Sequence, residues 1–234
     1  MNTYNLKARV FPVILAILPI VIIGFAYSLS FKSYYLLLVS FGITAALYFL
    51  FSQLGRDKGK AIEKEMWKKW GGAPTTQILR YSNKIIDKHT KYKYHSNLKE
   101  FTGIGEELNE EFEKKFPDKA DEIYQAWTKF LISRTRDTKK YNLLFHENIN
   151  YGFRRNLFGL KRIAIFITLL LMIGNFYYSF ITNGNKLVFT SDLMISQTIL
   201  LLILIFWLAI VNENWIKIVA FSYAERLMET IENL

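Results

Sequence analysis

The sequence contains no cysteine, and histidine occurs only three times in 234 residues. Without cysteine the chain has no disulfide framework and no thiolate ligand for a metal ion. The histidines are His89, His95 and His146, and they lack the spacing of a zinc site. Glu147 follows His146, but the second histidine of a zinc-binding helix is missing. We therefore expect neither a metal site nor a cofactor.

Charge is also absent from four apolar stretches, at residues 10–27, 34–54, 163–178 (or slightly beyond) and 193–211. An α-helix rises about 1.5 Å per residue, so runs of roughly 17 to 25 apolar residues can cross the hydrocarbon core of a bilayer. The sequence therefore predicts an all-α integral membrane protein. It should have four transmembrane helices, arranged as two hairpins, and a central α-helical cytosolic domain.

The first apolar stretch has a second interpretation. Lys7 and Arg9 precede it, and a basic start before an apolar run is also typical of a cleaved signal peptide. We favour a retained helix because the run is long and a second apolar run follows at once. Pro19 lies in the middle of the stretch and predicts a kink there.

The net charge of +10 is concentrated in the middle of the chain. Residues 55–162 hold 24 lysines and arginines and 15 acidic residues, so nine of the ten net charges lie there. The two loops on the opposite side of the membrane carry Lys32 and Lys186 as their only basic residues. Under the positive-inside rule this asymmetry places the basic block and both termini in the cytosol. We expect a multi-pass protein of the inner (plasma) membrane, in contact with membrane lipids.

Four segments follow from this topology. They are an N-terminal transmembrane hairpin (1–54), a basic cytosolic helical domain (55–162), a C-terminal transmembrane hairpin (163–211) and a cytosolic amphipathic helix (212–234). The last segment has two interpretations. It either continues the fourth span and packs on the basic domain, or lies on the membrane surface or in an oligomer contact.

The start of the basic domain carries clear helix signals. Residues 56–70 repeat apolar side chains at helical spacing and predict a helix that continues out of the second span. Gly71 is expected to end this helix. After a turn, Thr75 or Thr76 is expected to cap the next one.

The rest of the basic domain is less regular. Residues 88–99 alternate basic and aromatic side chains, which we interpret as a loop or short strand. Such a run could stack on single-stranded nucleic acid, although a solvated loop is the simpler interpretation. Residues 120–131 follow a helical period.

Uncharged polar residues are rare in the predicted spans. Thr44 lies in the second span, Asn175 in the third, and Gln197 and Thr198 in the fourth. Ion-coupled transporters and proton relays usually need a charged residue inside a span, and these spans have none. The four polar side chains therefore either bond helix to helix or line a pore in an oligomer.

Residues 70–80 have the features of an anion-binding loop. Gly71 and Gly72 let a backbone approach closely, Thr75 and Thr76 offer hydroxyls, and Arg80 lies about one turn further on. Phosphate or a lipid head group could bind such a cradle. The simpler interpretation is an elbow between two helices with a threonine cap.

A second candidate anion site, at residues 134–155, contains more basic residues than the loop at residues 70–80. Arg134 and Arg136 precede two lysines, and Arg154 and Arg155 lie close to the third span. Arginines among amide and tyrosine side chains suit a nucleotide or another phosphate. The alternative is a basic face that meets anionic lipid.

No enzyme signature is complete. The segment 55–61 reads GRDKGKA and fails the spacing of a phosphate-binding P-loop. Asp137, His146 and Glu147 are acid–base candidates near the bilayer, but they lack the pairing of an active site. We therefore expect a protein that is not an enzyme.

The layout of two spans, a basic cytosolic domain and two further spans resembles signal-gated membrane effectors of bacterial defence systems. The resemblance implies that the cytosolic domain senses an anionic ligand, such as a nucleotide, or a partner. The membrane helices of a homo-oligomer would then permeabilise or perturb the inner membrane. The alternative is a non-enzymatic scaffold that recruits a cytosolic protein to the acidic and aromatic surface of residues 106–127.

Overall fold

The structure is a computed structural model that describes residues 3–30 and 34–234. Within these ranges, it describes all side chains except those of residues 28–30, 34–37, 40, 41 and 44. Helices make up 83% of the chain, and the described residues contain no strand. The all-α prediction is therefore confirmed.

The chain divides into two compact units. Unit 1 consists of Met1–Ile62 and Gly152–Trp215, and unit 2 of Glu63–Tyr151 and Ile216–Leu234. Three helices contribute residues to both units, and these are α2 (Tyr34–Trp70), α7 (Asn142–Thr182) and α9 (Glu213–Glu229). The four segments predicted from the charge pattern stay a prediction.

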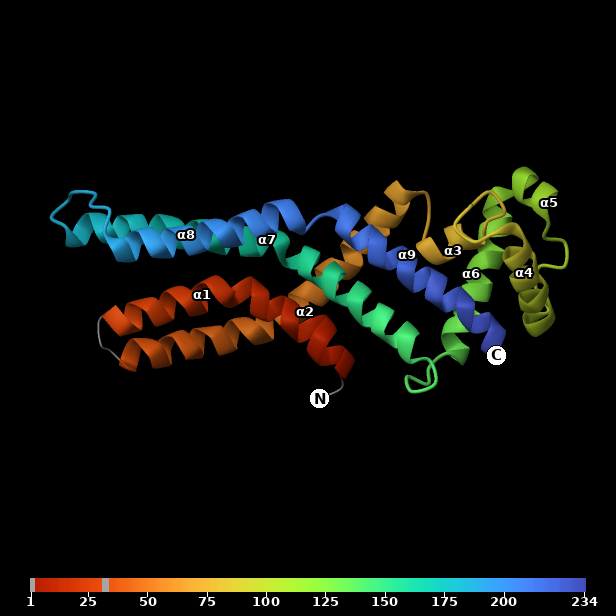
Figure 1. Cartoon of the computed structure of the whole chain (residues 1–234), viewed down its shortest axis with the longest axis horizontal. Helices are drawn as coiled ribbons and strands as arrows, with labels where there is room; N and C mark the ends of the chain where they lie inside the picture. Colours follow the sequence, from red (N-terminus) through yellow and green to blue (C-terminus); the bar gives the residue numbers. More distant parts are fainter. Residues whose placement is uncertain (1–2, 31–33) are drawn as a thin grey trace. The chain divides into compact units, whose positions relative to one another are not determined.

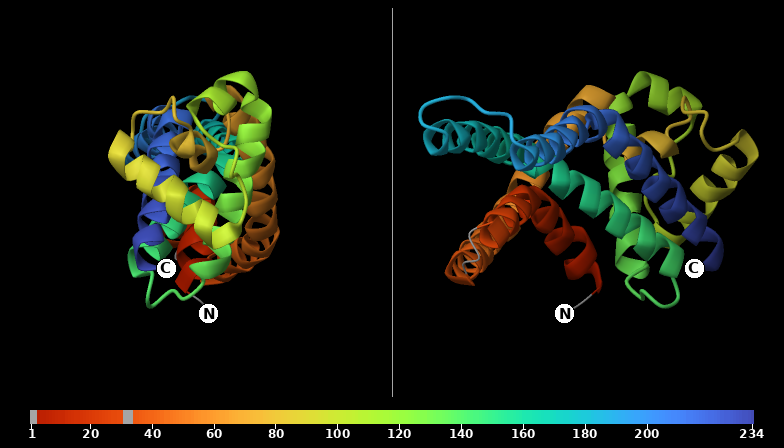
Figure 2. Two further views of the ribbon diagram at one scale, coloured as in Figure 1. Left: turned by 90° about the vertical axis from the view of Figure 1, so that its right-hand side faces the viewer. Right: turned by 60° about the vertical axis from the view of Figure 1, so that its left-hand side comes forward.

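Unit 1 is built from apolar helices. Besides its parts of α2 and α7, it contains the π-helical segment η1 (Asn5–Val10), α1 (Phe11–Ser30), α8 (Ser191–Ile205) and the π-helical segment η2 (Phe206–Ile210). Figure 1 shows α1 alongside the first part of α2, and α8 alongside the last part of α7. Both pairs stay together in the turned views of Figure 2.

Three helical stretches of the described chain are long and apolar enough to cross a membrane. They are Asn5–Tyr27, Asn142–Thr182 and Ser191–Ile210, and they include the first, third and fourth predicted spans. The second predicted span, at 34–54, belongs to α2. Because many of its side chains fall outside the described residues, it stays a prediction.

Glycine allows α2 and α7 to touch through their backbones within unit 1. A Cβ on Gly159 would lie 2.7 Å from the backbone nitrogen of Gly59 and 3.0 Å from the carbonyl oxygen of Gly55. No side chain fits there unless a backbone moves, and small residues produce the same close approach in other membrane helices. The segment that fails as a P-loop therefore serves helix packing.

Unit 2 is a helical domain with an aromatic core. It contains α3 (Pro74–Leu79), α4 (Lys88–Thr102), α5 (Glu110–Lys115), α6 (Pro117–Arg134) and the 3-10 segment η3 (Thr230–Asn233). Trp127 and Tyr124 of α6 are completely buried, together with Leu98 of α4. Figure 1 shows α4 beside α6, as their shared core requires.

The C-terminal helix completes this core. Ala224, Leu227 and Met228 of α9 are buried in the same cluster as Trp127. The interpretation that residues 212–234 pack on the basic domain is therefore supported for the end of α9. However, α9 does not continue α8, because the helix is interrupted at Val211.

The prediction of a loop or short strand at residues 88–99 is wrong, because these residues form most of α4. The Asp87 side chain caps the helix by accepting a hydrogen bond from the backbone N–H of Thr90 at 3.0 Å. Gly103 ends it in the left-handed region with φ 63°. The alternation of basic and aromatic residues concealed a buried helical face, made by Lys91, Tyr94, His95 and Leu98.

The prediction for the end of α2 is confirmed, and the prediction for the start of α3 is wrong. Helix α2 ends at Trp70, and Gly71 follows with φ 87°, as predicted. The expected threonine cap is wrong, because Ala73 occupies the cap position of α3 and Pro74 its first turn. Proline needs no N–H partner at that place, so the helix starts without a side-chain cap.

Candidate functional site

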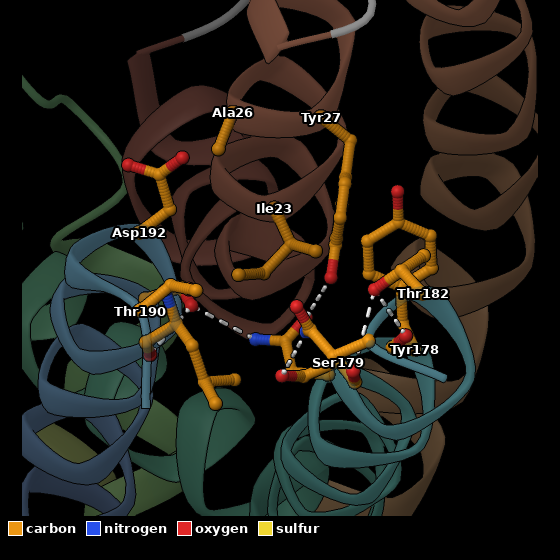
Figure 3. A pocket seen from close by; sticks show the side chains of 12 residues that line it. Ile23, Ala26, Tyr27, Tyr178, Ser179, Thr182, Thr190 and Asp192 are labelled. Atoms are coloured by element: carbon orange, nitrogen blue, oxygen red, sulfur yellow. Dashed lines mark hydrogen bonds between the residues drawn. The ribbon is translucent and has the colours of Figure 1, made fainter. Parts of the chain in front are cut away.

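A polar pocket lies among the apolar helices of unit 1. It has a volume of about 250 Å³ and is open to one side. Helices α1, α7 and α8 line it, together with the segment that joins α7 to α8 (Figure 3). We call it the tyrosine–asparagine pocket. Its lining residues are Ile23, Ala26, Tyr27, Asn175, Tyr178, Ser179, Thr182, Asn183, Thr190, Asp192, Leu193 and Ser196.

Asn175 is the centre of the hydrogen bonds in this pocket. It is 2% exposed, and its Oδ1 accepts from the Tyr27 hydroxyl at 2.9 Å. Its Nδ2 lies 3.2 Å from the Ser196 hydroxyl oxygen, which in turn donates to the carbonyl of Leu193 at 3.0 Å. One amide of α7 thus joins α1 and α8, and each such bond between membrane helices is worth roughly 0.6 to 1.7 kcal/mol.

A second set of hydrogen bonds fixes the segment that joins α7 to α8. The Ser179 hydroxyl donates to the carbonyl of Val188 at 2.9 Å, and Asn183 Nδ2 donates to the carbonyl of Ser179 at 2.7 Å. The Thr190 hydroxyl caps α8 by accepting from the backbone N–H of Leu193. The mouth of the pocket is therefore anchored to α7 on one side and to α8 on the other.

The pocket has a negative charge and aromatic walls. Asp192, in the first turn of α8, is the only charged residue among the twelve that line it. The rings of Tyr27 and Tyr178 meet edge to face with their centres 5.0 Å apart. Figure 3 shows Asp192 and Thr190 at one side of the pocket, Tyr178 and Thr182 at the other, and Tyr27 between them.

Of the four polar span residues singled out in the sequence, one lies in this pocket, and this is Asn175. Gln197 joins α8 to α7, because its Nε2 donates to the carbonyl of Met172 at 2.8 Å. Its buried Oε1 has no hydrogen-bond partner among the described residues. Thr198 is exposed and bonds to Met194 of its own helix. The side chain of Thr44 lies outside the described residues.

Sequence reasoning missed most of the pocket. The region from Thr182 to Asp192 reads as a turn-rich linker, and Tyr27 as part of an aromatic belt at the membrane surface. One signal could have been used, because Asn175, Ser179 and Asn183 follow each other at intervals of four residues. Residues at that spacing share one face of a helix, so the third span has a polar stripe at its end.

In unit 2, the predicted anion cradle is occupied by the protein itself. Arg80 forms two hydrogen bonds with the carboxylate of Asp121, at 2.8 and 2.5 Å. Gln77 Nε2 donates to the carbonyl of Gly72 at 2.6 Å, and the neighbouring Thr76 is buried. Gly71 and Thr75 are more accessible. An anion at this loop would have to compete with Asp121 for Arg80.

The four arginines of the second candidate site belong to different units. Arg134 and Arg136 are exposed residues of unit 2, and Arg134 lies over the Phe130 ring at 5.3 Å. Arg154 and Arg155 belong to unit 1. Arg154 donates to the carbonyl of Trp215 at 2.7 Å and lies 4.6 Å from the centre of its ring.

Unit 2 also buries a polar cluster around Glu113. This carboxylate accepts from the Tyr124 hydroxyl at 2.6 Å and from the backbone N–H of Tyr81 at 2.8 Å. Burial raises the pKa of Tyr81 to about 12, and burial together with Glu113 raises the pKa of Tyr124. Both phenols therefore stay protonated, so the cluster stabilises the fold and offers no proton for catalysis.

A buried base and a buried amine lie beside this cluster. Burial lowers the pKa of His95 to about 4, and its Nε2 lies 2.8 Å from the carbonyl of Leu79. Burial also lowers the pKa of Lys91, whose ammonium group donates to the carbonyls of Arg80, at 2.9 Å, and Asn83. The Lys91 ammonium and the Nε2 of His95 thus bond to backbone oxygens, as is usual for buried polar groups, whereas the buried Nδ1 of His95 has no hydrogen-bond partner among the described residues.

The acid–base candidates of the sequence do not form a site. Asp137 accepts hydrogen bonds from the backbone N–H groups of Lys139 and Lys140, which lowers its pKa. His146 is exposed and Glu147 half-buried, one turn into α7. Within the described residues, no three His, Cys, Asp or Glu side chains are grouped so that they could hold a metal ion.

Comparison of the chain with protein families, with curated proteins and with solved structures found no match in any of the three.

Proposed function

We propose that the chain is a four-span protein of the bacterial inner membrane that acts as a signal-responsive effector. Unit 2 and both termini lie in the cytosol, where unit 2 receives an anionic ligand or partner. Several copies assemble through their membrane helices, and the bound signal changes their packing so that the membrane is permeabilised or perturbed.

The membrane part of the proposal rests on unit 1. Three apolar helices of the described chain satisfy the length of a bilayer crossing. Large apolar side chains point outward from them, for example Phe166 at 66% and Ile195 at 61% exposed. An apolar surface of this kind is unfavourable in water and suits lipid or a second copy of the chain. Residues 34–54 supply the fourth crossing, which brings the chain back to the cytosol before unit 2.

The observation that carries the signalling part is the connection between α6 and α7, which we call the basic connection. It contains the exposed cations Arg136, Lys139 and Lys140, and it follows the exposed Arg134 at the end of α6. Only Tyr141 separates it from α7, which runs as one helix of 41 residues from unit 2 into the apolar part of unit 1. An anion bound at the connection would act on the first turn of a membrane helix.

The basic connection also borders a cavity of about 310 Å³ in unit 2. Lys140 and Arg226 supply positive charge to its lining, and Tyr141 supplies a ring. Lys140 donates to the carbonyl of Asn233 at 3.1 Å, while Arg226 pairs with Glu229 at 2.5 Å. A phosphate group would meet the Lys140 ammonium group there, and it would have to compete with Glu229 for Arg226.

A double charge reversal tests the proposal. The variant Arg136→Glu/Lys139→Glu removes charge from the basic connection, and Lys84→Glu/Lys129→Glu is the matched control on other exposed lysines of unit 2. Each protein is expressed in bacteria, and growth and a membrane-potential dye are followed. We expect depolarisation with the wild type and the control, and at least a tenfold smaller effect with the first variant.

Binding measurements separate a soluble signal from lipid. Purified protein in neutral nanodiscs is titrated with ATP, and again with vesicles of phosphatidylglycerol. Binding of ATP that the double variant loses supports a nucleotide-like signal. Binding of vesicles alone would mean that the basic connection is a lipid-facing surface. If the wild type changes neither potential nor growth, the effector function is wrong.

A scaffold is the second candidate, favoured by exposed apolar residues in unit 2. Phe101, Ile104 and Phe116 are 42%, 44% and 38% exposed, and the acidic helix α5 lies between them in the sequence. Trp127 is completely buried and cannot contribute to docking. A partner recovered by the wild type, lost by Ile104→Ser/Phe116→Ser and retained by Ile132→Ser would support this function.

A further inference from the structure

The tyrosine–asparagine pocket has a chemistry that the effector function does not use. Its lining combines one carboxylate, two tyrosine rings and several hydroxyl groups, and it contains no cation. In the described residues, Asp192 has neither an ion pair nor a hydrogen-bonded side chain. It therefore differs from Asp121 and Glu113 of unit 2, whose carboxylates form hydrogen bonds within the fold.

We propose that this pocket binds an organic ammonium group, carried by a small soluble amine or by the head group of an ethanolamine phospholipid. The proposal concerns unit 1 alone, so it stands or falls independently of the effector function.

Charge favours a cation. The carboxylate of Asp192 is the acidic group of the lining, and the helix dipole at the N-terminus of α8 supplies only about half an elementary charge of opposite sign. An anion would meet repulsion without a compensating side chain. Asp192 is exposed, so water weakens its attraction for a cation, and the rings and hydroxyl groups of the lining have to contribute to binding as well.

The aromatic walls favour an organic ammonium over a hydrated ion. Tyrosine rings attract cations over their faces, and the attraction grows when the site is shielded from water. Tyr27 and Tyr178 form one wall at a ring distance of 5.0 Å, opposite the side from which Asp192 enters (Figure 3). An ammonium group between them would contact the carboxylate at one end and the rings at the other.

The oxygen atoms around the pocket suit the hydrogens of a primary amine. Such a group donates three hydrogen bonds and accepts none. The hydroxyls of Thr182, Thr190 and Ser196 belong to the lining and have lone pairs to offer, although each also bonds to the protein. A divalent metal is a poorer fit, because it prefers several oxygen ligands with more negative charge than the single carboxylate of Asp192.

The volume limits the ligand. About 250 Å³ is below the range of roughly 300 to 1,000 Å³ that is usual for drug-sized ligands. The pocket admits an ammonium group with a short carbon chain, such as ethanolamine. A nucleotide or a sugar phosphate would exceed this space and bring the wrong charge.

The test uses the full chain in nanodiscs and ethanolamine as the soluble probe. Calorimetry in phosphatidylcholine nanodiscs measures binding of ethanolamine, and native mass spectrometry measures retention of phosphatidylethanolamine against phosphatidylglycerol. We expect saturable binding of ethanolamine if the amine is soluble, or selective retention of phosphatidylethanolamine if it belongs to a lipid. Absence of both, or equal retention of the two lipids, would overturn the proposal.

Three variants assign the binding to this pocket. Asp192→Asn keeps the shape of the side chain and should weaken binding at least tenfold. Tyr178→Leu should weaken it about threefold, because it removes a ring. Thr198→Val, an exposed position on the same helix α8, should leave binding unchanged. Thermal melting of each variant shows whether unit 1 is intact, and undiminished binding by a folded Asp192→Asn protein would also overturn the proposal.

Discussion

The two units of this chain place their apolar side chains in opposite ways. In unit 2 the core aromatic residues Tyr124 and Trp127 are completely buried, and aromatic residues outside the core, such as Phe101, are partly exposed. In unit 1 many of the large apolar residues point outward, as Ile173 of α7 does at 66% exposure. Burial from water drives the packing of unit 2, whereas helices in lipid gain little from burying apolar surface. The exposed apolar side chains of unit 1 suit the lipid environment that we propose for it, whereas unit 2 has the buried apolar core of a domain in water.

The two units also use different polar groups to join their helices. Unit 2 buries or half-buries charges, and it pairs them, as with Arg80 and Asp121. The helices of unit 1 are joined by neutral amides, through Asn175 and Gln197. A charge inside lipid is far more costly than an amide, so unit 1 obtains its specificity from hydrogen bonds without charge.

The largest effect should come from filling the glycine contact of unit 1. Gly159→Leu places a side chain where a Cβ already lies 2.7 Å from the backbone of Gly59. We expect a loss of about 3 kcal/mol or more, seen as failure to purify a folded protein or as a greatly lowered Tm in detergent. Gly174→Leu is the control on the same helix, because a Cβ there meets no atom within 4 Å. Equal melting of both variants would contradict the contact.

The next effect should come from the core of unit 2. Trp127→Ala leaves a cavity at a completely buried position and should cost about 3 to 5 kcal/mol. Hydrogen exchange on the full chain measures where the protection is lost. If the units respond separately, the loss concentrates in α4, α6 and the end of α9, which share this core. Phe116→Ala, at a half-exposed position, should cost much less.

The stability of unit 2 should also depend on acid through His95. Its pKa falls from 6.5 in the unfolded chain to about 4 in the fold, because burial disfavours the charged imidazolium. The unfolded chain therefore binds a proton first as the pH drops. Stability is complete above pH 6.5, declines below it, and from this group levels off near pH 4, for a total of about 3 kcal/mol.

The measurement is the free energy of unfolding of unit 2 between pH 7 and 4. His95→Gln keeps a donor for the carbonyl of Leu79 but removes the titrating group. The slope in this interval should be smaller in the variant. An unchanged slope would show that other groups cause the acid sensitivity.

The smallest effect should come from the neutral polar contacts of unit 1. Asn175→Leu removes the bonds to Tyr27 and Ser196 and should cost about 1 kcal/mol. Thr198→Val is the comparison, and its loss should be near zero because Thr198 bonds only within α8. Equal losses for the two, measured by thermal melting in detergent, would mean that bonds between helices stabilise unit 1 no more than bonds within one.

The sequence predicted those structural features that depend on the residues of one segment alone. Long uncharged stretches identify helices of membrane length, and a glycine after Trp70 identifies a helix end. It was misleading at α4, because the charged Lys91 and the basic His95 are buried there. Their burial becomes favourable only through carbonyl oxygens from residues 79–83, which no local pattern reveals.

The pocket shows the same limit. Asn175 could be recognised as a polar residue inside an apolar stretch, and its four-residue spacing from Ser179 was visible. That Tyr27, from a distant part of the sequence, completes the same cluster depends on how three helices pack. Likewise, the pairing of Arg80 with Asp121 could not be read from either segment alone.

The bond between Tyr27 and Asn175 joins residues 148 positions apart. A ribosome adds about 5 to 20 residues per second, so roughly 7 to 30 seconds pass between the synthesis of one partner and that of the other. During this interval the first helix has to remain in place with its phenol bonded to something else, such as water or a lipid head group. In the proposed topology, the first helix must therefore be stable in the bilayer before α7 is synthesised.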